Sequence, residues 1–157
     1  MKLDAWRLVK GKVASEALSG EGARLYGGRW NSPGYPLVYT AEHASLAVLE
    51  LLVHLGSSAV LSAYVLIRCE FESEMVERVR AEQLPGAWRS SPPLLELREL
   101  GDQWIEAQRS VVLEVPSAVL PIERNYLFNP AHADFKRVRV EEPQAFNSDP
   151  RLVGLGS

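Results

Sequence analysis

The fold is decided by the stretch Val60-Leu61-Ser62-Ala63-Tyr64-Val65-Leu66-Ile67-Arg68-Cys69-Glu70-Phe71, in which two kinds of side chain alternate. One face of the alternation is apolar throughout and consists of Leu61, Ala63, Val65, Ile67, Cys69 and Phe71. The opposite face is mostly polar and carries Ser62, Tyr64, Arg68 and Glu70. A two-residue period with one apolar face is typical of a half-buried strand in an antiparallel sheet. Residues 60–71 therefore predict a long strand with one face on the core.

The residues before this strand predict a helix over Ala41–Leu55. Apolar side chains recur there at the helical period, at Ala44, Ala47, Val48, Leu51, Leu52 and Leu55. Three more widen the apolar surface beyond one stripe, namely Leu46, Leu49 and Val53. A helix that is apolar on most sides is expected to be largely buried. Thr40 is the expected N-cap, Glu42 adds negative charge to the first turn, and Gly56 is the expected C-terminal stop.

Shorter elements are expected on both sides of these two. Strands are predicted at Leu3–Val9 (a strand or an extended arm), Leu37–Tyr39, Ser110–Val115 and Phe135–Val140. Helical or turn-like segments are predicted at Leu94–Leu100 and Asp102–Arg109, with Asp102 as a cap and Trp104 in the core. A polar loop that turns sharply is expected between Gly20–Gly22 and Gly27–Gly28. The pattern predicts a single α+β domain over residues 1–157, with a mixed or antiparallel sheet core and flanking helices.

The composition narrows the class of protein further. The chain has 157 residues, of which 46% are hydrophobic and 24% charged, as in an ordinary globular domain. A net charge of −3 argues against a protein whose main role is to bind the nucleic-acid backbone. The single cysteine, Cys69, excludes an intramolecular disulfide and zinc sites built from several cysteines. With no signal peptide and no apolar run near the roughly 20 residues of a membrane helix, we expect a cytoplasmic protein that does not contact membranes.

The densest cluster of chemically capable residues is Gly27-Gly28-Arg29-Trp30-Asn31. Glycines let the backbone approach a ligand closely, and the guanidinium of Arg29 fits phosphate or carboxylate. One interpretation is a site for an anion and an aromatic ring, such as a nucleotide. The other is a tight turn with a solvated arginine, and the sequence alone leaves both open.

Glu50 is the sharper candidate, because it lies in the apolar helix. A buried carboxylate is costly unless it is paired or functional, so Glu50 should face a cleft or a cation, with Arg29 the obvious partner. The alternative is a surface pair with His54, four residues on. Neither His54 nor His43 has the spacing of a metal-ligand pair. Tyr39 would stand at the corner between strand and helix, as a ligand contact or as an ordinary core tyrosine.

Taken together, these residues resemble the RES-domain family, named for characteristic arginine, glutamate and serine residues. The resemblance covers nearly the whole chain. The matching pieces are Ala5-Trp6-Arg7-Leu8, Gly27-Gly28-Arg29-Trp30-Asn31, Val38-Tyr39-Thr40-Ala41, Leu46-Ala47-Val48-Leu49-Glu50, Leu100-Gly101-Asp102-Gln103-Trp104, Val115-Pro116-Ser117, Asn125-Tyr126-Leu127-Phe128-Asn129-Pro130 and Asp149-Pro150-Arg151-Leu152.

The resemblance implies a fold like that of diphtheria-toxin-type ADP-ribosyltransferases. It also implies a toxin of a bacterial toxin–antitoxin system that arrests growth by destroying NAD, through hydrolysis or phosphorolysis of the nicotinamide–ribose bond. NAD is then the substrate, and no metal is required. The alternatives are a mono-ADP-ribosyltransferase that modifies a specific protein and a binding module without catalysis. The implied partner is an Xre-like helix-turn-helix antitoxin that covers the active site, with DNA reached only through it and homo-oligomers possible within the complex.

The resemblance also assigns roles to residues. The catalytic set is Arg29, Tyr39, Glu50 and Ser117, with Ser110 as the second choice of serine. The residues expected to contact the dinucleotide are Arg7, Gly28, Trp30, Asn31 and Ser110. Apart from the resemblance, Leu152, Val153 and Leu155 near the C-terminus are exposed candidates for packing or assembly, and we expect this tail to dock on the domain's own core.

Overall fold

The alternating stretch forms the strand β3 (Tyr64–Glu72), preceded by a 3-10 turn over Leu61–Ala63. This computed structural model describes residues 1–55 and 61–152. Ile67, Cys69 and Phe71 are buried on one face of β3. Its partner β1 (Lys2–Lys10) is antiparallel over the whole length. A half-buried antiparallel strand is thus confirmed from Tyr64 onward, and so is a strand near the N-terminus. The predicted start was wrong, because Leu61–Ala63 form the 3-10 turn, and Val60 lies outside the described residues.

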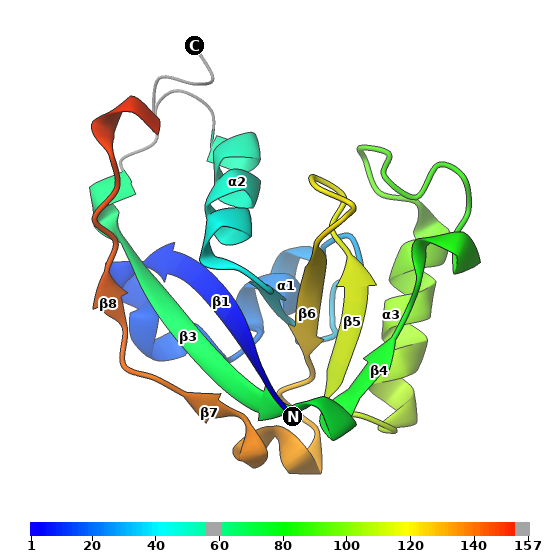
Figure 1. Ribbon diagram of the computed structural model, residues 1–157. Helices are drawn as coiled ribbons and strands as arrows, with labels where there is room; N and C mark the ends of the chain where they lie inside the picture. The colour runs from blue at the N-terminus through cyan, green and yellow to red at the C-terminus, as the bar shows by residue number, and fades with distance from the viewer. Residues whose placement is uncertain (56–60, 153–157) are drawn as a thin grey trace.

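The described strands form one sheet in the order β4-β5-β6-β2-β1-β3-β7, with β8 also paired to β3 (Figure 1). Only the β4–β5 pair is parallel among them, so the sheet is mixed. The remaining strands are β2 (Val38–Ala41), β4 (Val76–Arg78), β5 (Val112–Pro116), β6 (Arg124–Phe128), β7 (Arg139–Val140) and β8 (Gln144–Ala145). The predicted α+β class with a mixed sheet is confirmed.

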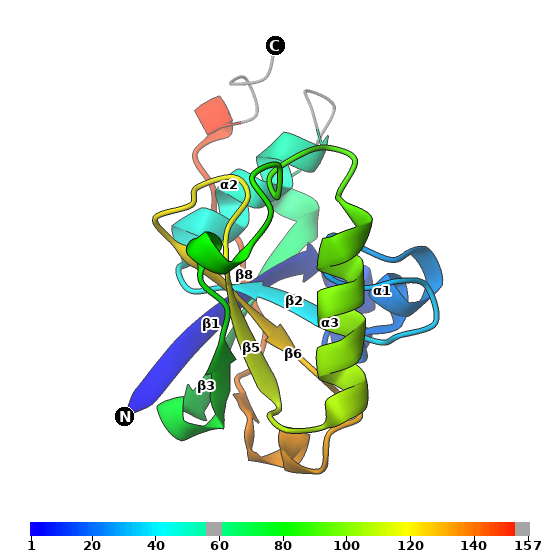
Figure 2. The same ribbon diagram turned by 90° about the vertical axis from the view of Figure 1, so that its right-hand side faces the viewer.

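The α-helices are α1 (Glu21–Tyr26), α2 (Ala44–Leu55) and α3 (Leu95–Ala107). Further 3-10 turns span Gly11–Glu16, Ser73–Met75, Ala81–Gln83 and Ala133–Arg137. Helix α3 covers the β5–β6 side of the sheet (Figure 2), and α2 packs against β1 and β2. In the described residues, no helix has both the length and the apolar character needed to cross a bilayer.

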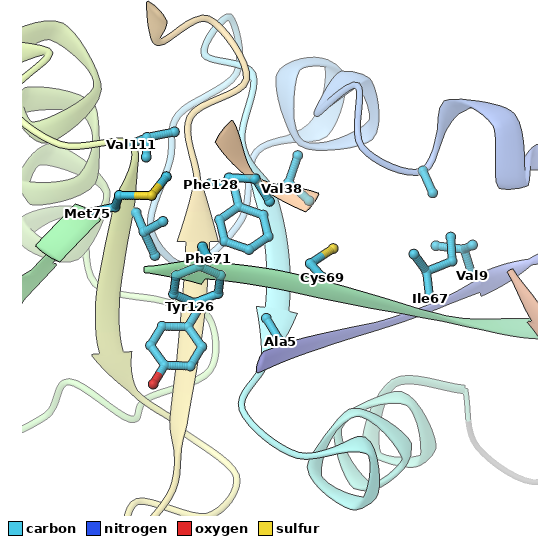
Figure 3. Close-up of a cluster of buried hydrophobic side chains, with 13 residues drawn as sticks. Ala5, Val9, Val38, Ile67, Cys69, Phe71, Met75, Val111, Tyr126 and Phe128 are labelled. Atoms are coloured by element: carbon cyan, nitrogen blue, oxygen red, sulfur yellow. The ribbon is translucent and has the colours of Figure 1, made fainter. Parts of the chain in front are cut away.

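Two core clusters lie on opposite faces of the sheet, because neighbouring residues of a strand point to opposite sides. On β6, Phe128 joins the cluster around Phe71 and Cys69 (Figure 3). The preceding residue, Leu127, joins the cluster that includes Trp30 and the α3 residues Leu97 and Trp104. A third, smaller cluster joins α2 to the sheet through Ala41, Leu46 and Ala47. Helices α2 and α3 therefore hold fixed positions relative to the β5–β6 hairpin.

The predicted start and burial of the first long helix were wrong. Thr40 does not cap α2, because it belongs to β2 and its hydroxyl donates to the carbonyl of Tyr126 at 2.6 Å. The helix begins three residues beyond Ala41, at Ala44. It is also less buried than expected, since Leu49 is 41% and Val53 65% exposed. The predicted stop at Gly56 lies outside the described residues.

Three other local predictions were also wrong. The supposed polar loop before Gly27 contains helix α1. Most of Phe135–Val140 lies in a 3-10 turn, and only Arg139–Val140 pairs as a strand. The two helical segments around Gly101 are one helix, so Asp102 is internal; it accepts a hydrogen bond from the Ser32 amide at 2.8 Å. Val153 and Leu155 lie outside the described residues.

Candidate active site

The carboxylate of Glu50 is held by the β5–β6 hairpin. Its Oε2 accepts a hydrogen bond from the hydroxyl of Ser117 at 2.9 Å, and its Oε1 accepts one from the amide of Asn125 at 2.9 Å. Partial burial raises the pKa of Glu50, and the nearby charge of Glu123 raises it further. The hydrogen bonds from Asn125 and Ser117 and the proximity of His54 lower this pKa, but burial has the larger effect. The carboxylate is thus oriented from both sides in a poorly solvated position.

Ser117 owes its position to the turn that follows β5. Its backbone amide donates to the carbonyl of Glu123 at 3.0 Å, which closes the hairpin loop. Its hydroxyl accepts from the amides of Val119 at 3.2 Å and Leu120 at 3.1 Å, while it donates to Glu50. Because Ser117 donates to Glu50 while two backbone amides donate to its hydroxyl, the direction of the Ser117 hydroxyl is fixed, and it helps to orient the carboxylate.

The Gly27–Asn31 segment forms a tight turn locked by Tyr39. The Tyr39 hydroxyl accepts from the Trp30 amide at 3.0 Å and donates to Asn31 Oδ1 at 2.6 Å. A Cβ on Gly28 would come within 2.5 Å of that hydroxyl, so the position needs glycine. Burial raises the pKa of Tyr39, which keeps the phenol protonated. The tight-turn interpretation therefore explains most of this motif.

Trp30 and Asn31 serve this turn and the core. Trp30 is 2% exposed and packs in the α3-side cluster. The Asn31 amide is fully buried and donates to the carbonyls of Ala23 at 2.9 Å and Tyr35 at 3.0 Å. Contact of either residue with a dinucleotide stays a prediction that these structural roles do not favour.

Arg29 is the member of the motif that is left for a ligand. One guanidinium nitrogen, Nη1, donates to the carbonyls of Trp88 at 3.0 Å and Ser90 at 2.9 Å. Partial burial lowers the pKa of Arg29, although an arginine remains charged. A second cation stands beside the turn, because Arg98 on α3 donates to the Gly28 carbonyl at 2.9 Å.

The predicted direct pair between Arg29 and Glu50 was wrong. In the part of the chain that the structure describes, no ion pair or hydrogen bond joins them. Glu50 accepts hydrogen bonds from two neutral side chains, and Arg29 donates to backbone carbonyls. They are linked indirectly through Arg89, which lies in the sequence between the two residues whose carbonyls bind Arg29. The guanidinium of Arg89 donates to the Ala118 carbonyl at 2.9 Å. Ala118 adjoins Ser117, so the segment that binds Arg29 also contacts the hairpin loop that binds Glu50.

The two other predicted contact residues also have structural partners. Arg7 donates to the carbonyls of Ala17 at 2.7 Å and Tyr39 at 2.8 Å, and its burial lowers its pKa. The hydroxyl of Ser110 accepts from the Trp104 indole at 2.8 Å and donates to the Val112 carbonyl at 3.2 Å. Of the two candidate serines, Ser117 is the one that contacts Glu50.

Two hollows among the described residues lie away from Glu50 and do not correspond to the predicted cleft. One hollow of about 300 Å³ lies between β4 and α3, lined in part by Arg78 and Trp104. Another of about 250 Å³ is lined in part by Met75 and Arg137. Neither is lined by Glu50 or Arg29.

Two residues of this site, Asn125 and Arg98, were not predicted from the sequence. Asn125 had a visible signal, because it is a polar residue at the start of the strand β6. Arg98 had none, since an arginine on a helix is commonly a solvated surface residue. In the described segments, one group could offer metal ligands, with atoms of Glu42, His43 and Glu123 within 4.8 Å of one another. Such partly exposed acidic groups are common without a metal.

The fold and this site define a class of protein: a small α+β domain that fixes one carboxylate between a helix and a β-hairpin. Residues 4–149 match the RES domain family, and the chain belongs to it. A protein called "Toxin Res" from Photorhabdus laumondii is 39% identical over 149 residues, covering 94% of this chain and 96% of that protein. A protein called "Prs ADP-ribosylating toxin" from a Sphingobium species is 36% identical over 158 residues, covering 98% of each.

A solved structure has a similar fold. It is the crystal structure of the M. tuberculosis MbcT–MbcA toxin–antitoxin complex, with a TM-score of 0.77 at 19% sequence identity, covering 99% of this chain and 89% of the other. In sequence, 37 residues of this chain (23% of it) are 51% identical to the M. tuberculosis protein called "NAD(+) phosphorylase MbcT". At this overall identity the structural match establishes the fold alone.

Proposed function

We propose that this protein is the toxin of a bacterial toxin–antitoxin system and that it depletes NAD by cleaving the nicotinamide–ribose bond. The observation that carries the proposal is the carboxylate of Glu50, oriented by Ser117 and Asn125 in a chain of the RES domain family. The toxin names of relatives that match over their full length, and the NAD(+) phosphorylase name of MbcT, support it.

The chemistry requires a fixed negative charge. When the bond between nicotinamide and ribose breaks, its electron pair leaves with nicotinamide, and positive charge develops on the ribose, as in glycoside cleavage. A preorganised carboxylate in a poorly solvated position stabilises that charge more strongly than water does. Glu50 fits this role, and Ser117 and Asn125 keep its oxygens from turning away.

The cation and the tyrosine complete the proposed site. Arg29, with Nη1 bound to two carbonyls, would present its other N–H groups to the pyrophosphate of NAD. The Tyr39 hydroxyl is occupied by the Trp30 amide and by Asn31, so its ring face is the part that could stack on nicotinamide. Its hydroxyl also holds the turn that carries Arg29.

The direct test is incubation of the purified protein with NAD, with and without inorganic phosphate, followed by separation of the products. We expect nicotinamide to be released, with ADP-ribose as the second product if water is the acceptor and its 1″-phosphate if phosphate is. NAD that remains intact under both conditions would reject the proposal. NAD that binds saturably without turnover would favour a binding module instead.

A second candidate function is mono-ADP-ribosylation of a specific protein. The full-length relative called "Prs ADP-ribosylating toxin" favours it, and bond cleavage is the same first step. NAD labelled in the adenylate moiety and incubated with cell extract separates the two: a labelled protein band supports transfer, whereas label found only in small molecules supports hydrolysis or phosphorolysis.

We propose an Xre-like helix-turn-helix antitoxin as the partner that covers the site. The toxin–antitoxin complex of the structurally similar MbcT supports the coarser part of this proposal, an antitoxin partner. Co-expression should restore growth and block NAD cleavage in the complex. Contact with DNA would then occur through the antitoxin. Both proteins would act in the cytoplasm, where NAD is available.

Substitution of the two serines should separate their roles. Ser117→Ala removes a hydrogen bond to Glu50 and an acceptor for two amides, so we expect NAD turnover to fall about tenfold and the free energy of unfolding to fall by about 1–3 kcal/mol. Ser110→Ala is the matched control, because its contacts to Trp104 and Val112 are remote from Glu50. It should cost stability without lowering turnover per folded molecule. Equal turnover losses in both variants would contradict the assignment.

A further inference from the structure

The hairpin that holds Glu50 carries a second carboxylate, Glu123. The amide of Glu123 donates to the Leu120 carbonyl at 2.9 Å, and its carbonyl accepts from the Ser117 amide at 3.0 Å, so its backbone is fixed at the loop that also carries Ser117. Glu123 lies in a bend just before β6 (Arg124–Phe128), two residues from Asn125. Ligand atoms of Glu123, Glu42 and His43 lie within 4.8 Å of one another. The Glu123 carboxylate is also close enough to Glu50 to raise the pKa of Glu50, so the two carboxylates are neighbours.

One oxygen of Glu123 is buried without a partner. Among buried side-chain nitrogens and oxygens of the described residues, Glu123 Oε1 alone makes no hydrogen bond. Its acidic neighbour Glu42 is different, because Glu42 Oε1 accepts from the Arg124 amide at 2.8 Å. A buried carboxylate oxygen without a donor is costly, so this atom calls for a donor that the described chain does not supply.

We propose that Glu123 is a second catalytic carboxylate, whose Oε1 accepts a hydrogen bond from a hydroxyl of the nicotinamide ribose of bound NAD. This inference rests on the function proposed above and adds a residue to it. A ribose carries two neighbouring hydroxyls, and Glu50 and Glu123 offer two carboxylates from adjoining elements. Vicinal hydroxyls therefore match the paired acceptors.

The pair also has an electrostatic consequence. Two carboxylates near one another repel, and the influence of Glu123 on the pKa of Glu50, which it raises, agrees with their proximity. Positive charge that develops on the ribose relieves this repulsion. The transition state is then stabilised more than bound NAD, which is the condition for faster chemistry.

The test compares variants of the full-length protein on NAD and on analogues whose nicotinamide ribose lacks the 2′- or the 3′-hydroxyl. We expect Glu123→Ala to lower kcat/KM for NAD by about ten- to a hundredfold, because a hydrogen bond to a charged group is lost. On the analogue that lacks the contacted hydroxyl, the same variant should differ from the parent protein by less than about threefold. Glu123→Gln, which keeps an acceptor oxygen, should recover part of the loss.

Glu42→Gln is the matched control, because it removes a nearby charge while keeping an acceptor for the Arg124 amide. It should stay within about twofold of the parent protein on NAD. If Glu123→Ala and Glu123→Gln melt like the parent protein and show no loss, or equal losses on NAD and both analogues, the contact is refuted. Parent protein that cleaves NAD in the same assay shows that only this inference has failed; parent protein that leaves NAD intact overturns the proposed function and the inference together.

Discussion

Glu50→Gln should reduce NAD cleavage at least about a hundredfold and relieve growth arrest, while the protein remains folded. The glutamine has the same size and can still accept a hydrogen bond from Asn125, but it has no charge to stabilise the ribose as the bond breaks. Nicotinamide release by purified protein and growth on induction measure the two effects. Glu142→Gln, at an exposed position, is the control and should retain full activity.

The same variant has an unusual expected effect on stability. Burial raises the pKa of Glu50 above its ordinary value of 4.5, so the folded protein favours the protonated form and ionisation weakens folding. In the parent protein, stability from this group is therefore fully present below pH 4.5 and is lost as the pH rises through the raised pKa. At neutral pH we expect the free energy of unfolding of Glu50→Gln to lie within about 1 kcal/mol of that of the parent protein, or above it.

Activity should show the opposite pH dependence, because the ionised carboxylate is the active form. NAD cleavage is expected to fall on acidification with a midpoint above 4.5. Full toxicity of Glu50→Gln, or loss of activity only through unfolding, would refute the role of this residue. Unfolding in denaturant at neutral pH distinguishes the second case.

Predictions from the sequence succeeded where local pattern decides the structure. The alternation before Phe71 and the apolar period around Glu50 each follow from side chains a few residues apart. The partners of Glu50 do not, because Ser117 and Asn125 are 67 and 75 residues away in sequence. Only the family resemblance connected Ser117 to this site. The sequence around Glu50 does not indicate whether its carboxylate is bound by neutral donors or by a guanidinium.

The failed local predictions have competing tertiary contacts as their cause. Thr40 has the side chain of a helix cap, but pairing of β2 with β6 places its hydroxyl on the Tyr126 carbonyl. Phe135–Val140 looks like an alternating strand, yet only its last residues reach the edge of β3. Asp102 resembles a helix cap because it follows Gly101. The glycine does not end the helix, because it is required by the close approach of the Trp30 backbone.

Gly101→Ala should destabilise the protein strongly, although alanine is favoured over glycine within a helix by about 1 kcal/mol. A Cβ at Gly101 would stand 1.6 Å from the carbonyl oxygen of Trp30 and 2.7 Å from its carbonyl carbon, and these are backbone atoms that cannot rotate away. Helix α3 would have to move off the turn, so we expect a loss of about 3 kcal/mol or more in the free energy of unfolding. Denaturant unfolding measures it.

The consequence extends to the site, because α3 also supports the turn through Arg98, which binds the Gly28 carbonyl, and Arg29 adjoins Trp30. We therefore expect weaker NAD binding even at temperatures where Gly101→Ala is folded. Gly22→Ala is the matched control: this glycine is in α1, and a Cβ there meets nothing within 4 Å. That variant should be as stable as the parent protein or slightly more so. The two substitutions are chemically identical. Changes of opposite sign in the free energy of unfolding would therefore isolate the contact with Trp30. Equal stability of both variants would show that α3 does not need this close approach.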